Sequence, residues 1–274
     1  MTTHIQTHSG VFHADEVFAC AILRVVHGGD VEIHRSRDEL EGMDFVVDVG
    51  RVYDPATGRF DHHQRDFNMA RHDGAGYASA GLVMKEFAGR LALALGVHLA
   101  AVLDFEDTII RRVDQRDIGQ VTPESWEVSS QVSDFNPPWD APETDADACF
   151  MQAVDFAEGI MRRSIERSDS RYRAKDVLKN EAVVDGNVTR LPMWIPTSKG
   201  DVKTDWLAFE QAGSWRAVRQ RDGLMPPEAW LGLSGDELVE ASGVAGAVFV
   251  HRAGFMIINE TYEGLVEMIG RCSG

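Results

Sequence analysis

The chain has 274 residues, of which 44% are hydrophobic and 26% are charged, a composition typical of a folded globular protein and not of a disordered one. Its formal net charge of −17 argues against a broad nonspecific grip on duplex nucleic acid, because such binding depends on Lys and Arg displacing counterions. This charge does not exclude a short single strand held in a locally basic cleft.

The first zone of the chain, from Thr3 to about Gly119, alternates strand patterns with helical patterns. Short strands are expected at residues 5–7 and 45–49, with a third extended segment at 58–60. Two helices are expected between and after them, one with Phe18, Ile22 and Val26 on a single face and one with Val83, Phe87, Leu91 and Leu95. This alternation predicts an α/β fold whose sheet is parallel or mostly parallel and flanked by helices.

The second zone begins with a segment at residues 134–147 that is rich in acidic residues and proline and breaks regular structure. A long helical pattern follows, with Phe150, Val154, Ala157, Met161 and Ile165 on one side. Short strands at 206–210, 215–219 and 247–251 and a closing helix at 262–270 then predict a smaller α/β domain. The expected division is an N-terminal domain over residues 1–142, a connecting helix over 143–180 and a C-terminal domain over 181–274.

Targeting signals and a disulfide framework are not expected. The N-terminus lacks a basic region followed by an apolar core, and the longest apolar run, Leu91 to Leu103, is too short to span a bilayer. The cysteines Cys20, Cys149 and Cys272 are far apart and form no metal-binding or redox motif. We therefore expect a cytoplasmic protein with reduced thiols and no membrane partner.

Imidazole and carboxylate side chains gather where the three predicted strands end. His8, His13 and Asp15 follow the first strand, Asp48 lies in the second, and Asp61-His62-His63 follows the third. These groups are the usual protein ligands of Mn, Fe, Co and Zn, and strand ends commonly supply one site in α/β enzymes. A carboxylate among the valines around Asp48 is costly unless it is paired or metal-bound. A metal site is the leading interpretation, and a salt bridge is the alternative.

A set of motifs in a fixed order carries a family resemblance. In the first zone the motifs are Thr7–Glu16, Val47–Gly50, Val52–Pro55, Arg59–Gln64, Ser79–Leu82 and Val113–Asp117. In the second zone they are Asn136–Trp139, Ser214–Arg216 and Phe249–Phe255. In this order and spacing the motifs resemble the melanocyte proliferating gene family of metal-dependent hydrolases, a branch of the DHH phosphoesterase superfamily. The resemblance extends over the length of the chain.

The resemblance implies a two-metal phosphoesterase with a DHH-like catalytic domain at residues 1–142 and a substrate-binding domain at 181–274. It implies that one ion is held by His8, His13 and Asp48, and the other by Asp15, Asp48, His62 and Asp114. Asp48 would bridge the two ions, because two close cations need shared negative charge between them. The catalytic residues would be Asp48, His62 and His63.

The expected metal is manganese, with Mg, Co, Ni and Zn as alternatives. Many members of the superfamily have Asp-x-Asp where this chain has His13-Ala14-Asp15. A nitrogen ligand in place of oxygen makes the first site less suited to Mg²⁺, which prefers oxygen.

Substrate contacts are expected from His63, Arg116, Arg216 and His251. Adjacent side chains on an extended segment point in opposite directions, so His62 and His63 are not expected to bind the same ion. His63 is expected to support a metal ligand or to contact phosphate. Arg216 and His251 belong to the C-terminal motifs and would meet phosphate. Three roles remain open for Asp117, which could hold Arg116, orient a ligand or cap a turn.

The leading functional interpretation is a phosphodiesterase, a 3′–5′ exonuclease that acts on RNA or short oligonucleotides. The first alternative is a hydrolase of small phosphate compounds such as pyrophosphate or dinucleotides, and the second is a noncatalytic metal-binding protein. Trp139, Trp194 and Trp215 could stack on bases or pack in the core. The expected partner is a short single-stranded RNA or oligonucleotide, and a homodimer remains open.

Overall fold

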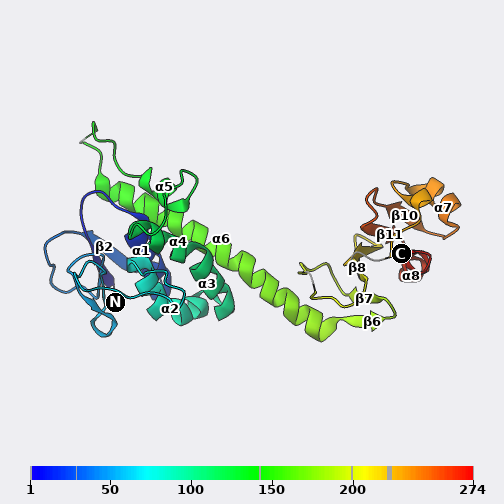
Figure 1. Cartoon of the computed structure of the whole chain (residues 1–274), viewed down its shortest axis with the longest axis horizontal. Helices are drawn as coiled ribbons and strands as arrows, with labels where there is room; N and C mark the ends of the chain where they lie inside the picture. The colour runs from blue at the N-terminus through cyan, green and yellow to red at the C-terminus, as the bar shows by residue number, and fades with distance from the viewer. Residues whose placement is uncertain (1, 29, 142, 199, 221–223, 274) are drawn as a thin grey trace. The chain divides into compact units, whose positions relative to one another are not determined.

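The computed structural model describes residues 2–28, 30–141, 143–198, 200–220 and 224–273. The chain forms two compact units, an N-terminal unit over Met1–Asp169 and a C-terminal unit over Ser170–Gly274. The boundary between them falls inside the long helix α6 (Ala146–Glu181), which covers most of the residues predicted to form a connecting helix (Figure 1). Among the described residues, no helix combines the length and the apolar character that a membrane crossing requires.

The N-terminal unit is built on a five-stranded sheet in the order β2-β1-β3-β5-β4. Its strands are β1 (Thr3–Thr7), β2 (Val31–Arg35), β3 (Phe45–Val47), β4 (Tyr53–Asp54) and β5 (Arg59–Phe60). Strands β2, β1, β3 and β5 run parallel, and only the edge strand β4 is antiparallel to its neighbour. The prediction of a mostly parallel sheet is confirmed. The carboxyl ends of the parallel strands therefore share one edge of the sheet.

Helices and short turns complete the N-terminal unit. They are α1 (Ala14–His27), the 3-10 turn η1 (Pro55–Thr57), α2 (Ser79–Leu95), α3 (Leu99–Phe105), the π-helical turn η2 (Glu106–Ile110), α4 (Arg111–Asp117) and α5 (Val128–Ser133). Helices α1 and α2 pack on each other, and their predicted apolar faces are largely buried. Val26 and Leu95, at the far ends of those faces, are partly exposed.

The first part of α6 belongs to the core of the N-terminal unit. All five residues of its predicted apolar side are fully buried, namely Phe150, Val154, Ala157, Met161 and Ile165. Arg24 of α1 also contacts Glu158 at 2.6 Å and Asp155 at 2.8 Å on this helix. The N-terminal unit thus continues past residue 142 and includes residues 143–169 of the predicted connecting helix.

The C-terminal unit has a six-stranded sheet in the order β10-β11-β9-β8-β7-β6. The strands are β6 (Val183–Asp185), β7 (Val188–Leu191), β8 (Trp206–Gln211), β9 (Ser214–Arg219), β10 (Ala247–Val250) and β11 (Met256–Asn259). The helical elements are η3 (Glu228–Trp230), α7 (Gly235–Ser242) and α8 (Tyr262–Gly270). The predicted strands and the closing helix of this unit are confirmed.

Each face of the C-terminal sheet has its own apolar cluster. One cluster joins the sheet residues Trp206 and Ile257 to Leu238 of α7 and Leu265 of α8. The other cluster lies over β7 and β8 and includes Ala174 from the end of α6. Alternation of side chains along the strands explains this division, because neighbouring residues point to opposite faces.

Candidate metal centre

The first part of the site is the turn between β1 and α1. His8 directly follows β1, and Asp15 and Glu16 stand in the first turn of α1, where carboxylates are favoured by the helix dipole. Glu16 caps the helix, because its Oε1 accepts from the backbone N–H of His13 at 2.8 Å. The same Oε1 lies 3.0 Å from Nε2 of His8. One carboxylate therefore fixes both the start of α1 and the ring of His8.

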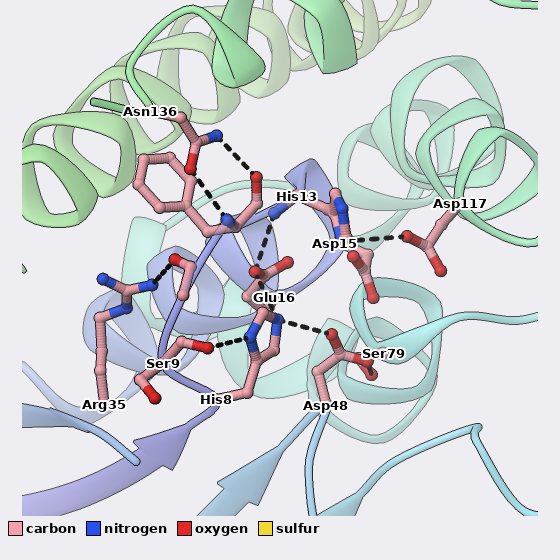
Figure 2. A network of polar contacts seen from close by, with 12 residues as sticks. His8, Ser9, His13, Asp15, Glu16, Arg35, Asp48, Ser79, Asp117 and Asn136 are labelled. Atoms are coloured by element: carbon pink, nitrogen blue, oxygen red, sulfur yellow. Dashed lines mark hydrogen bonds and ion pairs between the residues drawn. The ribbon is translucent and has the colours of Figure 1, made fainter. Parts of the chain in front are cut away.

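Asn136 holds this turn from outside. Its Oδ1 accepts from the backbone N–H of Phe12 at 2.9 Å, and its Nδ2 donates to the carbonyl of Phe12 at 2.9 Å (Figure 2). The Asn-Pro-Pro motif thus has a positioning role in the N-terminal unit. It fixes the residue that precedes His13 in the chain.

Asp48 occupies the centre of the cluster. Its backbone has a φ of 57°, a left-handed conformation that is uncommon for a residue other than glycine and is typical of constrained sites. Its Oδ2 lies 3.4 Å from Nε2 of His8, and its Oδ1 lies 3.2 Å from Nε2 of His62. The hydroxyl of Ser79, at the start of α2, donates to Oδ1 at 2.9 Å. The two oxygens of this one buried carboxylate therefore face different imidazoles (Figure 2 shows the contact with His8).

Asp61, His62 and His63 form an irregular segment directly after β5. The buried Asp61 accepts from the backbone N–H of His63 at 2.9 Å and lies 2.8 Å from Nδ1 of the same residue. The rings of His62 and His63 lie 4.3 Å apart, and Nδ1 of His63 is 3.5 Å from Oδ1 of Asp48. The expectation that these two side chains point in opposite directions is wrong. Strand β5 ends at Phe60, so the alternation of a strand does not apply to them.

Helix α4 contributes Asp117 to this cluster and directs Asp114 elsewhere. Oδ2 of Asp117 lies 3.2 Å from Nε2 of His62. Asp114 is fully buried and accepts from Arg71 at 2.7 Å and from the backbone N–H of Gly81 at 2.9 Å. Five of the six predicted ligands lie in groups of possible metal ligands, namely His8, His13, Asp15, Asp48 and His62. The same groups also contain Asp117, Glu16 and His63.

Sequence reasoning included Asp117 without assigning it to the metal. Asp114 and Asp117 stand three positions apart on a helix, so both project to similar sides, and the pattern does not tell which one reaches the ligands. Glu16 was missed, although its place three residues after His13 is the spacing of a helix-capping glutamate.

The centre contains buried carboxylate oxygens that receive no hydrogen bond from the described residues. Both carboxylate oxygens of Asp15 and Oε2 of Glu16 are buried, and they have no hydrogen-bond partner among the described residues. Burial and the nearby charges of Asp48 and Asp117 raise the pKa of Asp15 well above its usual value. A cation would stabilise the ionised form of these carboxylates, so the donor set fits divalent metal ions.

The neighbouring carboxylates also change the pKa values of the imidazoles. Contacts with Asp48 and Glu16 raise the pKa of His8 to about 10. Burial lowers the pKa of His62, but contacts with Asp117 and Asp48 outweigh it and raise that pKa to about 10. Burial would raise the pKa of Asp48, yet its contacts with His62 and His8 hold it below the usual range. The imidazoles and the carboxylate of Asp48 thus stabilise each other's charged forms.

Among the cavities that open on the centre, two are lined by arginine side chains. A cavity of about 650 Å³ is lined by His8, His13, Asp48 and His63, with Arg37 and Arg51 among its other lining residues. A second cavity of about 250 Å³ is lined by His13, Asp15 and Asp117 together with Arg116. The predicted substrate residue Arg116 therefore lies beside the cluster. Arg37 and Arg51 were missed by sequence reasoning, although Arg51 closely follows Asp48 at the end of β3.

The other predicted substrate residues belong to the C-terminal unit. Arg216 lies on β9, and its Nε is buried without a hydrogen-bond partner among the described residues. His251 follows β10, its Nδ1 accepts from the backbone N–H of Ala253 at 3.0 Å, and its ring lies 4.0 Å from that of Phe255.

Comparison with known proteins identifies the family. A family model named for the MYG1 exonuclease and described as uncharacterised protein family UPF0160 matches residues 4–192 and 211–272. The chain belongs to this family. It is 31% identical to the MYG1 protein C27H6.8 of Caenorhabditis elegans over 98% of this chain and 94% of that protein. It is 30% identical to the human MYG1 exonuclease over 96% of this chain and 84% of that protein.

Similarity to solved structures is weaker. The pGpG-specific phosphodiesterase PggH from Vibrio cholerae is 13% identical, with a TM-score of 0.35 over 97% of this chain and 95% of that chain. RecJ from Thermus thermophilus in complex with Mn²⁺ is 15% identical, with a TM-score of 0.27 over 97% of this chain and 51% of that chain. These values are too low to align individual residues.

Proposed function

We propose that this protein is a two-metal phosphoesterase of the phosphodiesterase class, acting as a 3′–5′ exonuclease on RNA or short oligonucleotides. The observation that carries the proposal is the carboxylate of Asp48, whose two oxygens face His8 at 3.4 Å and His62 at 3.2 Å. Such a group can serve two ions at once. The family relatives from human, cow, mouse and rat bear the name exonuclease, which supports the same class of reaction.

The distances favour a revised division of ligands. Nε2 of His62 lies within 3.8 Å of carboxylate oxygens from Asp15, Asp48 and Asp117, which makes these four residues our proposed ligands of one ion. His8, His13 and Asp48 are the proposed ligands of the other ion. Relative to the sequence prediction, Asp117 replaces Asp114, because both oxygens of Asp114 are already engaged by Arg71 and Gly81. Manganese is the proposed metal, since the set mixes nitrogen and oxygen donors.

The chemistry of the centre would come from both the ions and the chain. When bound, a pair of divalent ions polarises a phosphoryl group and balances charge on the attacking and leaving oxygens. Ser79 fixes Asp48 through its hydroxyl, and Asp61 fixes His63 through the ring and the backbone. The side chain of His63 is 54% exposed and lines the larger cavity, so it can reach a phosphate oxygen.

Arginine side chains supply local positive charge at the cavities, although the net charge of the chain is −17. Arg37 and Arg51 line the larger cavity, and Arg116 lines the smaller one. Guanidinium groups bind phosphate oxygens with two parallel hydrogen bonds. We propose that these arginines contact the phosphates of a short strand, and that Arg216 and His251 of the C-terminal unit add further phosphate contacts.

A substrate panel tests the reaction class. Purified protein loaded with Mn²⁺ is incubated with labelled short RNA, short DNA, a dinucleotide and pyrophosphate, and the Asp48→Asn variant is the matched control. We expect release of mononucleotides from RNA by the wild-type protein only. RNA labelled at its 3′ or 5′ end gives the direction of cleavage. Hydrolysis of pyrophosphate or the dinucleotide alone would replace the exonuclease with a hydrolase of small phosphates, and hydrolysis of none would indicate a noncatalytic protein.

A further inference from the structure

A second cluster of metal-ligand side chains lies on the N-terminal sheet, away from the centre described above. It consists of His4 on β1 and of Glu32 and His34 on β2. The register of these parallel strands places His4 opposite Glu32 and Gln6 opposite His34. Because side chains alternate along a strand, the three residues project from the same face of the sheet.

The three ligand atoms form a compact triangle. Nδ1 of His4 lies 3.2 Å from Nε2 of His34 and 3.5 Å from Oε2 of Glu32, and the remaining side is 3.8 Å. Zinc binds imidazole nitrogen and carboxylate oxygen at about 2.0–2.2 Å, so two ligand atoms on a tetrahedral zinc ion lie about 3.3–3.6 Å apart. The observed triangle is close to one face of that tetrahedron.

The cluster is separate from the candidate metal centre. His4 and His8 are four residues apart along β1 and its continuation, which corresponds to about 13 Å in an extended strand. That span is far beyond the reach of one ion. The cluster also faces solvent, since its side chains are 36%, 61% and 37% exposed in chain order.

We propose that His4, Glu32 and His34 bind one Zn²⁺ ion, with solvent in the fourth position. Two imidazoles and one carboxylate with an open position form a frequent zinc ligand set, whereas Mg²⁺ requires more oxygen ligands. The bound ion would join the edge strand β2 to its neighbour β1 and stabilise the N-terminal unit. In the metal-free protein, a hydrogen bond between the two imidazoles would take its place.

The proposal is tested by zinc counting on the full-length chain. Metal-stripped wild-type protein, His34→Ala, Glu32→Gln and His72→Ala are dialysed against micromolar zinc chloride, and bound zinc is measured by mass spectrometry. His72 is exposed and is in none of the ligand groups of the described residues, so its variant is the matched control. We expect one equivalent less in His34→Ala and Glu32→Gln, and no change in His72→Ala. Equal zinc in all four proteins, or an equal loss in the control, would overturn the proposal.

The position of the ion is tested by anomalous diffraction from crystals grown with zinc. We expect an anomalous peak between Nδ1 of His4, Nε2 of His34 and Oε2 of Glu32 in the wild-type protein. This measurement does not depend on how well the variants fold. Absence of a peak at those atoms would overturn the assignment, and the three groups would then be a hydrogen-bonded cluster.

Discussion

Arg71 donates a hydrogen bond of 2.7 Å to Asp114, and both side chains are buried. Arg71 also contacts Glu106 at 2.7 Å, while the backbone N–H of Gly81 donates to the other oxygen of Asp114 at 2.9 Å. The pair therefore connects α4, the turn η2 and the start of α2. These contacts indicate a structural role for Asp114, which is in none of the possible ligand groups among the described residues.

Replacement of Asp114 should separate stability from metal binding. We expect Asp114→Asn to lower the free energy of unfolding of the N-terminal unit by about 3 kcal/mol, because it breaks a buried ion pair. Its metal content should remain at the wild-type level. The matched variant Asp117→Asn should show the reverse, with loss of one ion and a smaller change in stability. Urea unfolding of metal-stripped protein and metal analysis give the two readouts. Loss of metal from Asp114→Asn alone would restore Asp114 to the ligand set.

Gly81 should tolerate no side chain. A Cβ at this position would lie 1.9 Å from Oδ2 of Asp114. We therefore expect Gly81→Ala to destabilise the N-terminal unit by about 3 kcal/mol, through overpacking and displacement of Asp114. Gly89 lies on the same helix, where a Cβ would meet nothing within 4 Å. Gly89→Ala should instead stabilise the unit by about 0.5–1 kcal/mol, and thermal unfolding compares the two variants. Equal effects would contradict this explanation.

The C-terminal residues should affect substrate and not metal. We expect Arg216→Ala and His251→Ala to keep full metal content and to lose about ten- to hundredfold in kcat/KM, the usual effect of removing a charge-assisted contact. Arg163→Ala, at an exposed arginine of α6 that has no part in the proposed site, is the control. Steady-state kinetics on the best substrate, with metal analysis of the same samples, provides the test. Wild-type efficiency in both variants would leave substrate binding to His63 and Arg116.

Truncation should show where the N-terminal unit ends. The apolar side of α6, from Phe150 to Ile165, is fully buried, and Arg24 binds Glu158 of the same helix. A fragment of residues 1–169 should therefore fold and bind as much metal as the full chain, whereas a fragment of residues 1–142 should not fold. Circular dichroism measures the folding of both fragments, and metal analysis measures their bound ions. A folded, metal-loaded 1–142 fragment would contradict the role given to α6.

Much of the fold follows from patterns in the sequence. The helices over Ala14–His27 and Tyr262–Gly270 bury residues at helical spacing, and the valines of Phe45–Val47 form an interior strand. These patterns are strong because each element buries one face or lies wholly in the core. The end of the N-terminal unit could not be predicted in the same way. An apolar helix side shows that α6 is buried along its first half, but not which unit covers it.

The sequence predicts which residue types form the candidate site and at which strand ends they lie. His8, Asp48 and His62 follow or close parallel strands, and such positions meet at one sheet edge. That Asp117 faces His62 while Asp114 pairs with Arg71 could not be foreseen. The π-helical turn Glu106–Ile110 shifts the face that α4 presents, and the partner Arg71 lies far away in the sequence. The local sequence pattern reveals neither the π-helical turn nor the distant partner Arg71.

The most direct test of a shared two-metal centre is the number of Mn²⁺ ions held by Asp48→Asn. Asparagine tolerates the left-handed backbone at this position, so the variant should keep the fold while it removes the charge between His8 and His62. We expect two ions per chain in the wild-type protein, little of either in Asp48→Asn, and loss of mainly one ion in His62→Ala, measured by equilibrium dialysis and elemental analysis. Two ions retained by Asp48→Asn would contradict the central claim.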